Sequence, residues 1–196
     1  MDTRLQTLLA LMRVTLVDPA EGARRVLAMD IPRAALWQGF ALVAVMAVLL
    51  LEASAALSPV SYPMIEALRA SPLRVALLQA FLLFVLIHAV YRIGALFGGT
   101  GSFDESLRLV VWLEIVLMTV QMVQTVISVV LPLLGSLIGM AALLWFLWAL
   151  TTMVTVLHGF SSRGLVFMGI TLSFFLIIFA LSIAMVMLGI VPPETM

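Results

Sequence analysis

Long apolar runs constrain this chain more than any other feature of its sequence. They fall at about residues 34–57, 73–97, 103–131, 134–157 and 164–190. A run of roughly 18 or more apolar residues is long enough to cross the hydrocarbon core of a membrane as a helix. The composition agrees, because 64% of the residues are apolar, whereas soluble domains have about 45–50%. We therefore predict an all-α polytopic membrane protein in which residues 34–196 form a five-helix transmembrane bundle.

The ends of these runs carry ordinary helix-ending signals. Ser71-Pro72 supplies an N-cap and a first-turn proline for the second span, and Ser102 with Glu105 forms an S-x-x-E capping box for the third. Ser58-Pro59 closes the first span, and Pro192-Pro193 follows the last one. Each run is therefore predicted to be a separate helix.

Residues 1–33 precede the first span and contain two shorter helical patterns. The first places five apolar side chains on one face: Leu5, Leu8, Leu9, Met12 and Leu16. The second opens with the cap sequence Asp18-Pro19-Ala20-Glu21. We expect both helices to be amphipathic and to lie at the membrane interface on the cytoplasmic side.

The arginines of this region suggest a surface. Arg13, Arg24 and Arg25 could face anionic headgroups, so that the helices bind lipid or a protein partner. The alternative is an anchor that rests against the bundle. The sequence alone does not distinguish a binding surface from an anchor.

The distribution of arginine predicts the orientation, because basic residues near span ends stay in the cytoplasm. With the N-terminus inside, that side holds Arg4, Arg13, Arg24, Arg25, Arg33, Arg92, Arg108 and Arg163, and the other side holds Arg69 and Arg74. We predict N-in, C-out. Because every basic residue is arginine and Ala, Leu and Val are abundant, we expect a bacterial protein of the cytoplasmic (inner) membrane.

Four ionisable residues fall at membrane depth, where a charge costs at least about 2.5–3.5 kcal/mol: Glu52, His88, Arg92 and Glu114. Glu52 lies about 7 to 8 Å from the outer end of the first span, where it could snorkel or meet Arg74, and we expect a structural role for it. His88 and Arg92 are four residues apart and share a helix face, and Arg92 lies about 9 Å from the inner end of its span. Glu114 lies on the next span, across the short 98–102 turn. We expect an ion pair between Arg92 and Glu114, with His88 able to join it.

Glu114 also begins a polar stripe on the third span. The stripe continues through Met118, Gln121, Thr125 and Ser128, with Gln124 beside it. It could form a hydrophilic path or proton relay, or it could fix helix packing by interhelical hydrogen bonds. We favour packing, since one carboxylate and two glutamines make a weak relay.

Signals for catalysis, metals and cofactors are missing from the sequence. It has no cysteine, and it contains no G-x-S-x-G, H-E-x-x-H or phosphate-loop motif. His158, at the end of the fourth span, is expected to be a helix-end residue because no second metal-type ligand lies near it in the sequence. Glycines at spacing four, Gly94/Gly98 and Gly135/Gly139, are expected to allow close packing within the bundle. We expect no catalytic residue, no metal and no cofactor.

The chain resembles the Yip domain proteins, which are Ypt/Rab-interacting membrane proteins with bacterial relatives. The resemblance rests on the five spans, the segment DPAEGARRVLAM, the turn FGGTGSFDESLRLVVW and the junction LHGFSSRGLVF. It implies a Gly-Gly-x-Gly-Ser-Phe loop motif, which is made here by Gly98, Gly99, Gly101, Ser102 and Phe103.

Eukaryotic members of that family act in vesicle trafficking with small GTPases and carry a cytosolic arm with an Asp-Leu-Tyr-Gly-Pro motif. The present sequence contains neither the arm nor the motif. This departure argues against a Rab-type GTPase partner. We expect membrane lipids and a protein partner or larger membrane complex as partners, and no nucleic acid.

Three classes of function follow. The preferred one is a non-enzymatic scaffold or accessory protein that organises the inner membrane or attaches to a larger membrane complex. The alternative is a transporter of a small solute, an ion or a lipid that uses Arg92, His88 and Glu114. A membrane-embedded enzyme is the third class, and no paired carboxylate or metal cluster supports it.

Overall fold

The structure, a computed structural model, describes residues 3–57 and 71–187, and these residues are helical apart from short connections. The first two helices are α1 (Thr3–Val17) and α2 (Pro19–Leu27). Five long helices follow: α3 (Arg33–Leu57), α5 (Pro72–Leu96), α6 (Phe103–Val130), α7 (Pro132–His158) and α8 (Arg163–Met187). All five are long and apolar enough to cross a membrane, as predicted. The Ser58-Pro59 and Pro192-Pro193 boundaries and Arg69 lie outside the described residues.

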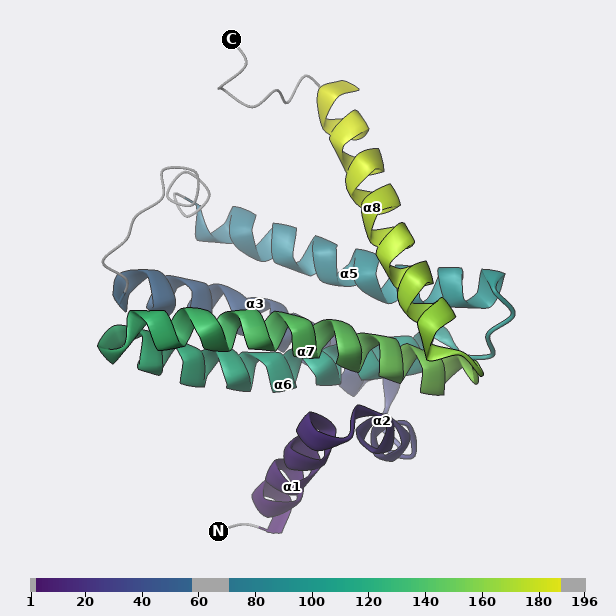
Figure 1. Cartoon of the computed structure of the whole chain (residues 1–196), viewed down its shortest axis with the longest axis horizontal. Coiled ribbons are helices and arrows are strands. Elements are labelled where there is room, and N and C mark those ends of the chain that lie inside the picture. The colour runs from purple at the N-terminus through teal and green to yellow at the C-terminus, as the bar shows by residue number, and fades with distance from the viewer. Residues whose placement is uncertain (1–2, 58–70, 188–196) are drawn as a thin grey trace.

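Four of the long helices lie side by side (Figure 1), with α6 packed against α3, α5 and α7. The α8 helix follows the end of α7, makes its main contact with α7, and diverges from the other four. One end of the bundle holds the start of α3, the α5–α6 loop and the α7–α8 turn. We call it the basic end, because Arg33, Arg92, Arg108 and Arg163 lie in these segments or within two turns of them.

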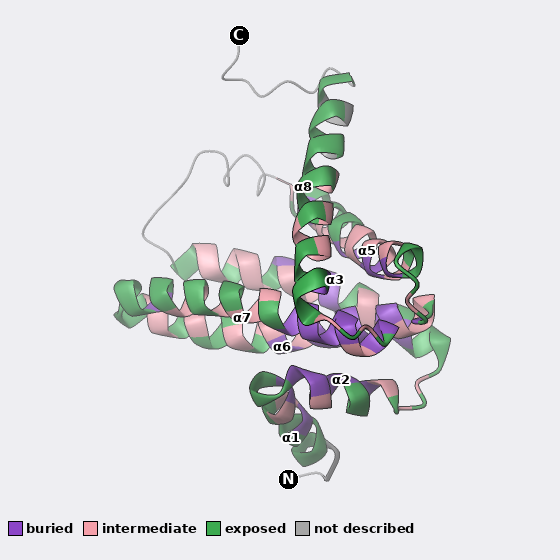
Figure 2. Cartoon of the chain, turned by 45° about the vertical axis from the view of Figure 1, so that its right-hand side comes forward, coloured by how far each residue is buried: buried purple, intermediate pink, exposed green. Residues whose placement is uncertain are grey.

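Burial is concentrated in the half of the bundle near the basic end (Figure 2). In α6 the buried residues fall between Ser106 and Val116, and in α7 all of them except Gly135 fall between Ala149 and His158. The other half of α6 and α7, and most of α8, expose large apolar side chains such as Leu133, Leu144 and Phe175. Exposed apolar surface of this extent is typical of helices that face lipid.

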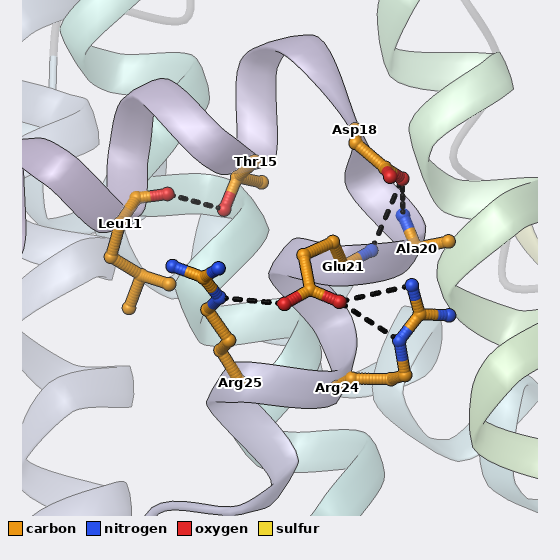
Figure 3. A network of polar contacts seen from close by, with 7 residues as sticks. All are labelled: Leu11, Thr15, Asp18, Ala20, Glu21, Arg24 and Arg25. Carbon is orange, nitrogen blue, oxygen red and sulfur yellow. Dashed lines mark hydrogen bonds and ion pairs between the residues drawn. The ribbon is translucent and has the colours of Figure 1, made fainter.

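The α1 and α2 helices form a hairpin that packs along α6 and α7. Asp18 caps α2 by accepting hydrogen bonds from the N–H groups of Ala20 (3.0 Å) and Glu21 (3.1 Å), as predicted (Figure 3). The hairpin is tight because Gly22 lies against Thr15, where an added Cβ would meet the Thr15 backbone. The buried face of α2 consists of Pro19, Ala20, Gly22, Ala23 and Val26.

Of the two predicted span caps, the one on the third span forms completely and the one on the second span forms only in part. Ser102 and Glu105 form the complete capping box, in which each side chain accepts a hydrogen bond from the backbone N–H of the other residue. Ser71 is the N-cap of α5 and Pro72 begins the helix, but the Ser71 side chain makes no capping hydrogen bond. The proline therefore defines this helix start more than the serine hydroxyl does.

Candidate functional site

The α5–α6 loop begins with a Schellman ending of α5. Gly98 has φ of +82°, in the left-handed region that favours glycine. Its N–H donates to the Ala95 carbonyl (3.0 Å), and the Gly99 N–H donates to the Gly94 carbonyl (2.9 Å). These bonds satisfy two carbonyls that the helix end would leave without partners. The first glycine of the loop motif is thus required by backbone conformation.

The later glycines of the loop enclose the imidazole of His158, which is only 2% exposed. The Gly101 N–H donates to Nδ1 (3.2 Å), and the other ring nitrogen, Nε2, lies 3.0 Å from the Val90 carbonyl. A carbonyl only accepts, so Nε2 carries the hydrogen and Nδ1 accepts. This pairing fits the neutral imidazole and fixes its tautomer.

Space around the imidazole is available only because three residues have no Cβ. A methyl group added at Gly94, Gly99 or Gly101 would overlap the side chain of His158 or of Leu157. We call Gly94, Gly99 and Gly101 the glycine socket. Together with the Thr100 N–H, which donates to the His158 carbonyl (3.4 Å), the socket fastens the end of α7 to the end of α5 and the start of α6.

His158 lies at the end of a helix, as predicted, but its contact with the loop motif was not predicted. The partners of His158 lie 57 and 68 residues away in the sequence. A usable signal was nevertheless present, since closely spaced glycines beyond what a turn needs indicate that another group approaches the backbone.

The last two residues of the loop motif begin α6. Ser102 caps the helix, and Phe103 packs its ring among aromatic residues of two other helices. The Phe103 ring centroid lies 6.1 Å from that of Trp37 on α3, 5.0 Å from that of His88 and 5.9 Å from that of Tyr91. Phe103 therefore ties the start of α6 to α3 and α5.

The contact between His88 and Phe103 also corrects a prediction. Within the described residues, Arg92 and Glu114 form no ion pair with each other. Arg92 is exposed, with its guanidinium carbon 5.4 Å from the ring centroid of Tyr91. His88 on α5 lies beside Phe103, the first residue of α6. Because α5 and α6 are antiparallel, Arg92 lies one turn nearer to the α5–α6 loop, where no residue of α6 is beside it. Glu114 is about 16 Å further along α6, which places it beside an earlier part of α5.

Glu114 instead lines a cavity of about 180 Å³ between α3, α5 and α6. Gln79 from α5 and Gln121 from α6 line the same cavity, and its other lining residues are apolar, among them Val48 and Leu51 from α3. Gln79 was missed, since its place depends on the register between α5 and α6. His88 and Arg92 do not line this cavity.

The rest of the polar stripe on α6 lies against neighbouring helices. The Thr125 hydroxyl is 2.9 Å from that of Ser54 on α3. On the α7 side, Gln124 lies against Gly139 and Ser128 lies against Gly135, so that an added Cβ at either glycine would overlap these side chains. These contacts contribute to helix packing and form no continuous polar path through the described bundle.

The N-terminal hairpin joins the bundle by side-chain hydrogen bonds as well as by burial. The Trp112 indole N–H donates to the Thr15 hydroxyl (3.0 Å), and the Trp145 indole N–H donates to the Leu16 carbonyl (3.0 Å). Near the basic end, Arg108 donates to the carbonyls of Leu27 (2.9 Å) and Met29 (2.6 Å). The end of α1 and the end of α2 are therefore both fixed to the bundle.

The arginines predicted to form a surface lie on the exposed side of this hairpin. Arg24 and Arg25 are both within 3.0 Å of the Glu21 carboxylate, and their side chains are 57% and 54% exposed (Figure 3). Hydrogen bonds from Arg25 and Arg24 lower the pKa of Glu21. Arg13 is exposed on α1. Glu21 thus offsets part of the positive charge of α2, while Arg13 has no such carboxylate partner among the described residues.

Several apolar side chains of α1 are not covered by other residues of the protein. Leu11 and Thr15 point to the bundle and are buried, whereas Leu5, Leu8 and Leu9 are 47%, 47% and 46% exposed. We call these three residues the α1 leucine face. The predicted apolar face of α1 is therefore mostly exposed, since Leu16 is exposed as well and Met12 is half-buried, whereas the residues that dock lie outside that face.

Within the described ranges, no three His, Cys, Asp or Glu side chains lie close enough to hold a metal ion. A sequence model of the Yip1 domain matches residues 13–184, which cover both the N-terminal hairpin and the bundle. No curated protein and no solved structure matches the chain.

Proposed function

The chain belongs to the Yip1 domain family of integral membrane proteins, and from that premise we propose that it is a scaffold or accessory protein that binds a membrane protein partner. The family consists generally of non-enzymatic membrane proteins, and the proposed role is non-enzymatic as well. The proposed partner contacts the α1 leucine face.

One observation carries this proposal: the last turn of α1 is held against the bundle, and its earlier turns expose leucines. Thr15 and Leu16 accept hydrogen bonds from two tryptophans of the bundle, so α1 does not need its leucines in order to stay docked. Leu5, Leu8 and Leu9 remain about half exposed. Rigid presentation of an apolar face lowers the entropy that a partner must overcome on binding.

We further propose a bacterial inner-membrane location with the N-terminus in the cytoplasm. The support is that Arg33 pairs with Asp104 at 3.3 Å and that Arg108 binds the chain just before α3, so these basic residues gather at one end of the bundle. Basic residues near span ends favour the cytoplasmic side. The exposed Arg13, Arg24 and Arg25 would then face anionic headgroups.

Transport through Arg92, His88 and Glu114 acting together has less support. Arg92 is exposed near Tyr91, and His88 packs on Phe103, so neither residue reaches the cavity that Glu114 lines. A shared solute site for the three residues would require α5 to slide along α6.

Co-purification tests the accessory role directly. The chain, with a C-terminal tag, is extracted from native membranes in mild detergent, and proteins that co-purify are identified by mass spectrometry against an untagged control. We expect one membrane protein in stoichiometric amount. Leu5→Gln, Leu8→Gln and Leu9→Gln together should release it, whereas Leu133→Ala with Leu137→Ala, on the far half of α7, should not.

A chain that purifies alone and monodisperse from every mild detergent would contradict the proposal. Retention of the partner by the α1 triple variant would remove α1 from the binding surface.

A further inference from the structure

The Glu114 cavity combines an unusual set of side chains. Glu114 and Gln79 are half-buried and Gln121 is exposed at the rim of the cavity, and none of the three forms a hydrogen bond or ion pair with another described residue. Unsatisfied polar groups in a membrane interior are costly, so they normally have a partner. Three such groups on one cavity therefore indicate an occupant that satisfies them.

The charge of this occupant follows from the carboxylate. Glu114 lies about 16 Å from the start of α6 and about 24 Å from its end, well inside the span Phe103–Val130. A carboxylate that stays ionised at this depth is stabilised by a neighbouring positive charge. Arg92, on the helix that faces Glu114, is exposed near Tyr91 and does not supply that charge.

The number of acceptors and the apolar lining define the occupant further. A carboxylate and two amide carbonyls supply three separate acceptors, and a primary ammonium group has three N–H donors. The wall from α3 is apolar, with Ala47, Val48 and Leu51. A cavity of about 180 Å³ is close in size to the roughly 150 Å³ cavity that holds benzene in another protein.

We propose that the α3–α5–α6 cavity binds a small primary alkylammonium ion. The ammonium group binds the Glu114 carboxylate and the side-chain oxygens of Gln79 and Gln121, and the alkyl group lies against Ala47, Val48 and Leu51. An alkali cation fits less well, because the cavity lining contributed by α3 is apolar and offers no side-chain oxygen ligand.

Binding is tested on the full chain in phosphatidylcholine nanodiscs, whose headgroups carry no N–H donor. Titration calorimetry and thermal unfolding are measured with n-butylammonium chloride. The matched probes are n-butanol, which lacks the charge, tetramethylammonium, which lacks N–H donors, and potassium chloride at equal ionic strength. We expect saturable binding and a raised unfolding temperature with n-butylammonium alone.

Substitutions of the residues that line the cavity test whether n-butylammonium binds there. Glu114→Gln should weaken binding of n-butylammonium at least tenfold, and Gln121→Leu and Gln79→Leu should weaken it severalfold. Arg92→Gln changes a charge on α5 outside the cavity and should leave binding unchanged. If Glu114→Gln does not fold, Ala47→Leu, which fills the cavity from α3, provides the same test.

Several results would overturn the proposal. Equal stabilisation by n-butanol would show an apolar cavity without charge recognition, and equal stabilisation by potassium would show a site for any monovalent cation. Stabilisation by phosphatidylethanolamine in place of added amine would assign the site to a lipid headgroup. Absence of n-butylammonium binding to the wild-type chain would leave water as the occupant. None of these results bears on the proposed accessory role.

Discussion

The backbone N–H of Gly101 donates a hydrogen bond of 3.2 Å to Nδ1 of His158, a residue 57 positions later in the chain. This bond joins the loop motif after α5 to the last residue of α7. Since Nε2 of the same ring is paired with the Val90 carbonyl, one buried imidazole links three helices. The bond gives the spacing of glycines within this loop a structural reason that does not involve a ligand.

Substitution of a socket glycine should destabilise the protein although alanine is the better helix former. Gly94→Ala places a methyl group against a ring that is hydrogen-bonded on both sides, and such overpacking costs about 1–3 kcal/mol. Gly169→Ala in α8 is the control, because nothing lies within 4 Å of its Cβ position, and there alanine should stabilise by up to about 1 kcal/mol. Thermal unfolding in one detergent, followed by tryptophan fluorescence, compares the two. Equal or higher stability of Gly94→Ala would contradict the socket.

Replacement of His158 by Phe keeps an aromatic ring but removes both nitrogens. The Gly101 N–H and the Val90 carbonyl would each lose a buried partner, at a cost of about 1–3 kcal/mol per group. Hydrogen–deuterium exchange over residues 97–102 should accelerate. His88→Phe is the matched control, because the Nδ1 of His88 is paired within its own helix, with the Phe84 carbonyl, and exchange in the loop should remain slow. Unchanged loop exchange in His158→Phe would argue against the link.

The hydrogen bond between Trp112 and Thr15 should hold α1 on the bundle. Thr15→Val preserves the size of the side chain but leaves the buried indole N–H without an acceptor, at a cost of about 1–3 kcal/mol. Limited proteolysis should then cut α1 faster. Thr119→Val is the comparison, since the Thr119 hydroxyl is exposed and donates to Ile115 of its own helix. Equal cleavage rates of the two variants would show that the bond does not anchor α1.

Two arginines at the basic end should differ in their contribution to stability. Arg108→Gln removes hydrogen bonds to the Leu27 and Met29 carbonyls and should cost about 1.5–3 kcal/mol. Arg33→Gln removes an ion pair with Asp104 whose side chains are 67% and 43% exposed, and such pairs contribute about 0–1 kcal/mol. Chemical unfolding of both variants provides the measurement. A larger loss in Arg33→Gln would contradict the assigned roles.

The Glu21 carboxylate should make α2 weakly sensitive to acid. Hydrogen bonds from Arg25 and Arg24 lower its pKa below the ordinary 4.5. Its contribution to folding is therefore present above pH 4.5 and is lost as the pH falls through the lowered pKa. Glu21→Gln should remove this part of the pH dependence between pH 5 and pH 3, measured by hydrogen exchange of α2. The same acid response in Glu21→Gln would mean that another group is responsible.

Local signals allowed the helices and their caps to be predicted. The spans follow from apolar length, and the caps at Asp18 and Ser102 follow from side chains that reach backbone groups two or three residues away. Such features depend on neighbouring residues and need no knowledge of tertiary contacts. For that reason the five spans and these two caps agree with the structure.

Features that depend on the register between helices could not be predicted. Arg92 and Glu114 have suitable charges, but Phe103 begins α6 level with His88, and this places Glu114 beside Gln79 and away from Arg92. The enclosure of His158 depends in the same way on how α7 meets the α5–α6 loop. Loop length alone does not determine either relationship.

The central claim, that α1 presents a surface to a protein partner, is tested most directly by site-specific photo-crosslinking in native membranes. A photoreactive residue replaces Leu8, which is 47% exposed, or Leu11, which is 5% exposed on the same helix. We predict one discrete protein adduct from position 8, and only intramolecular products from position 11. Lipid adducts alone from position 8 would contradict the claim and would show that the α1 leucine face rests in the membrane.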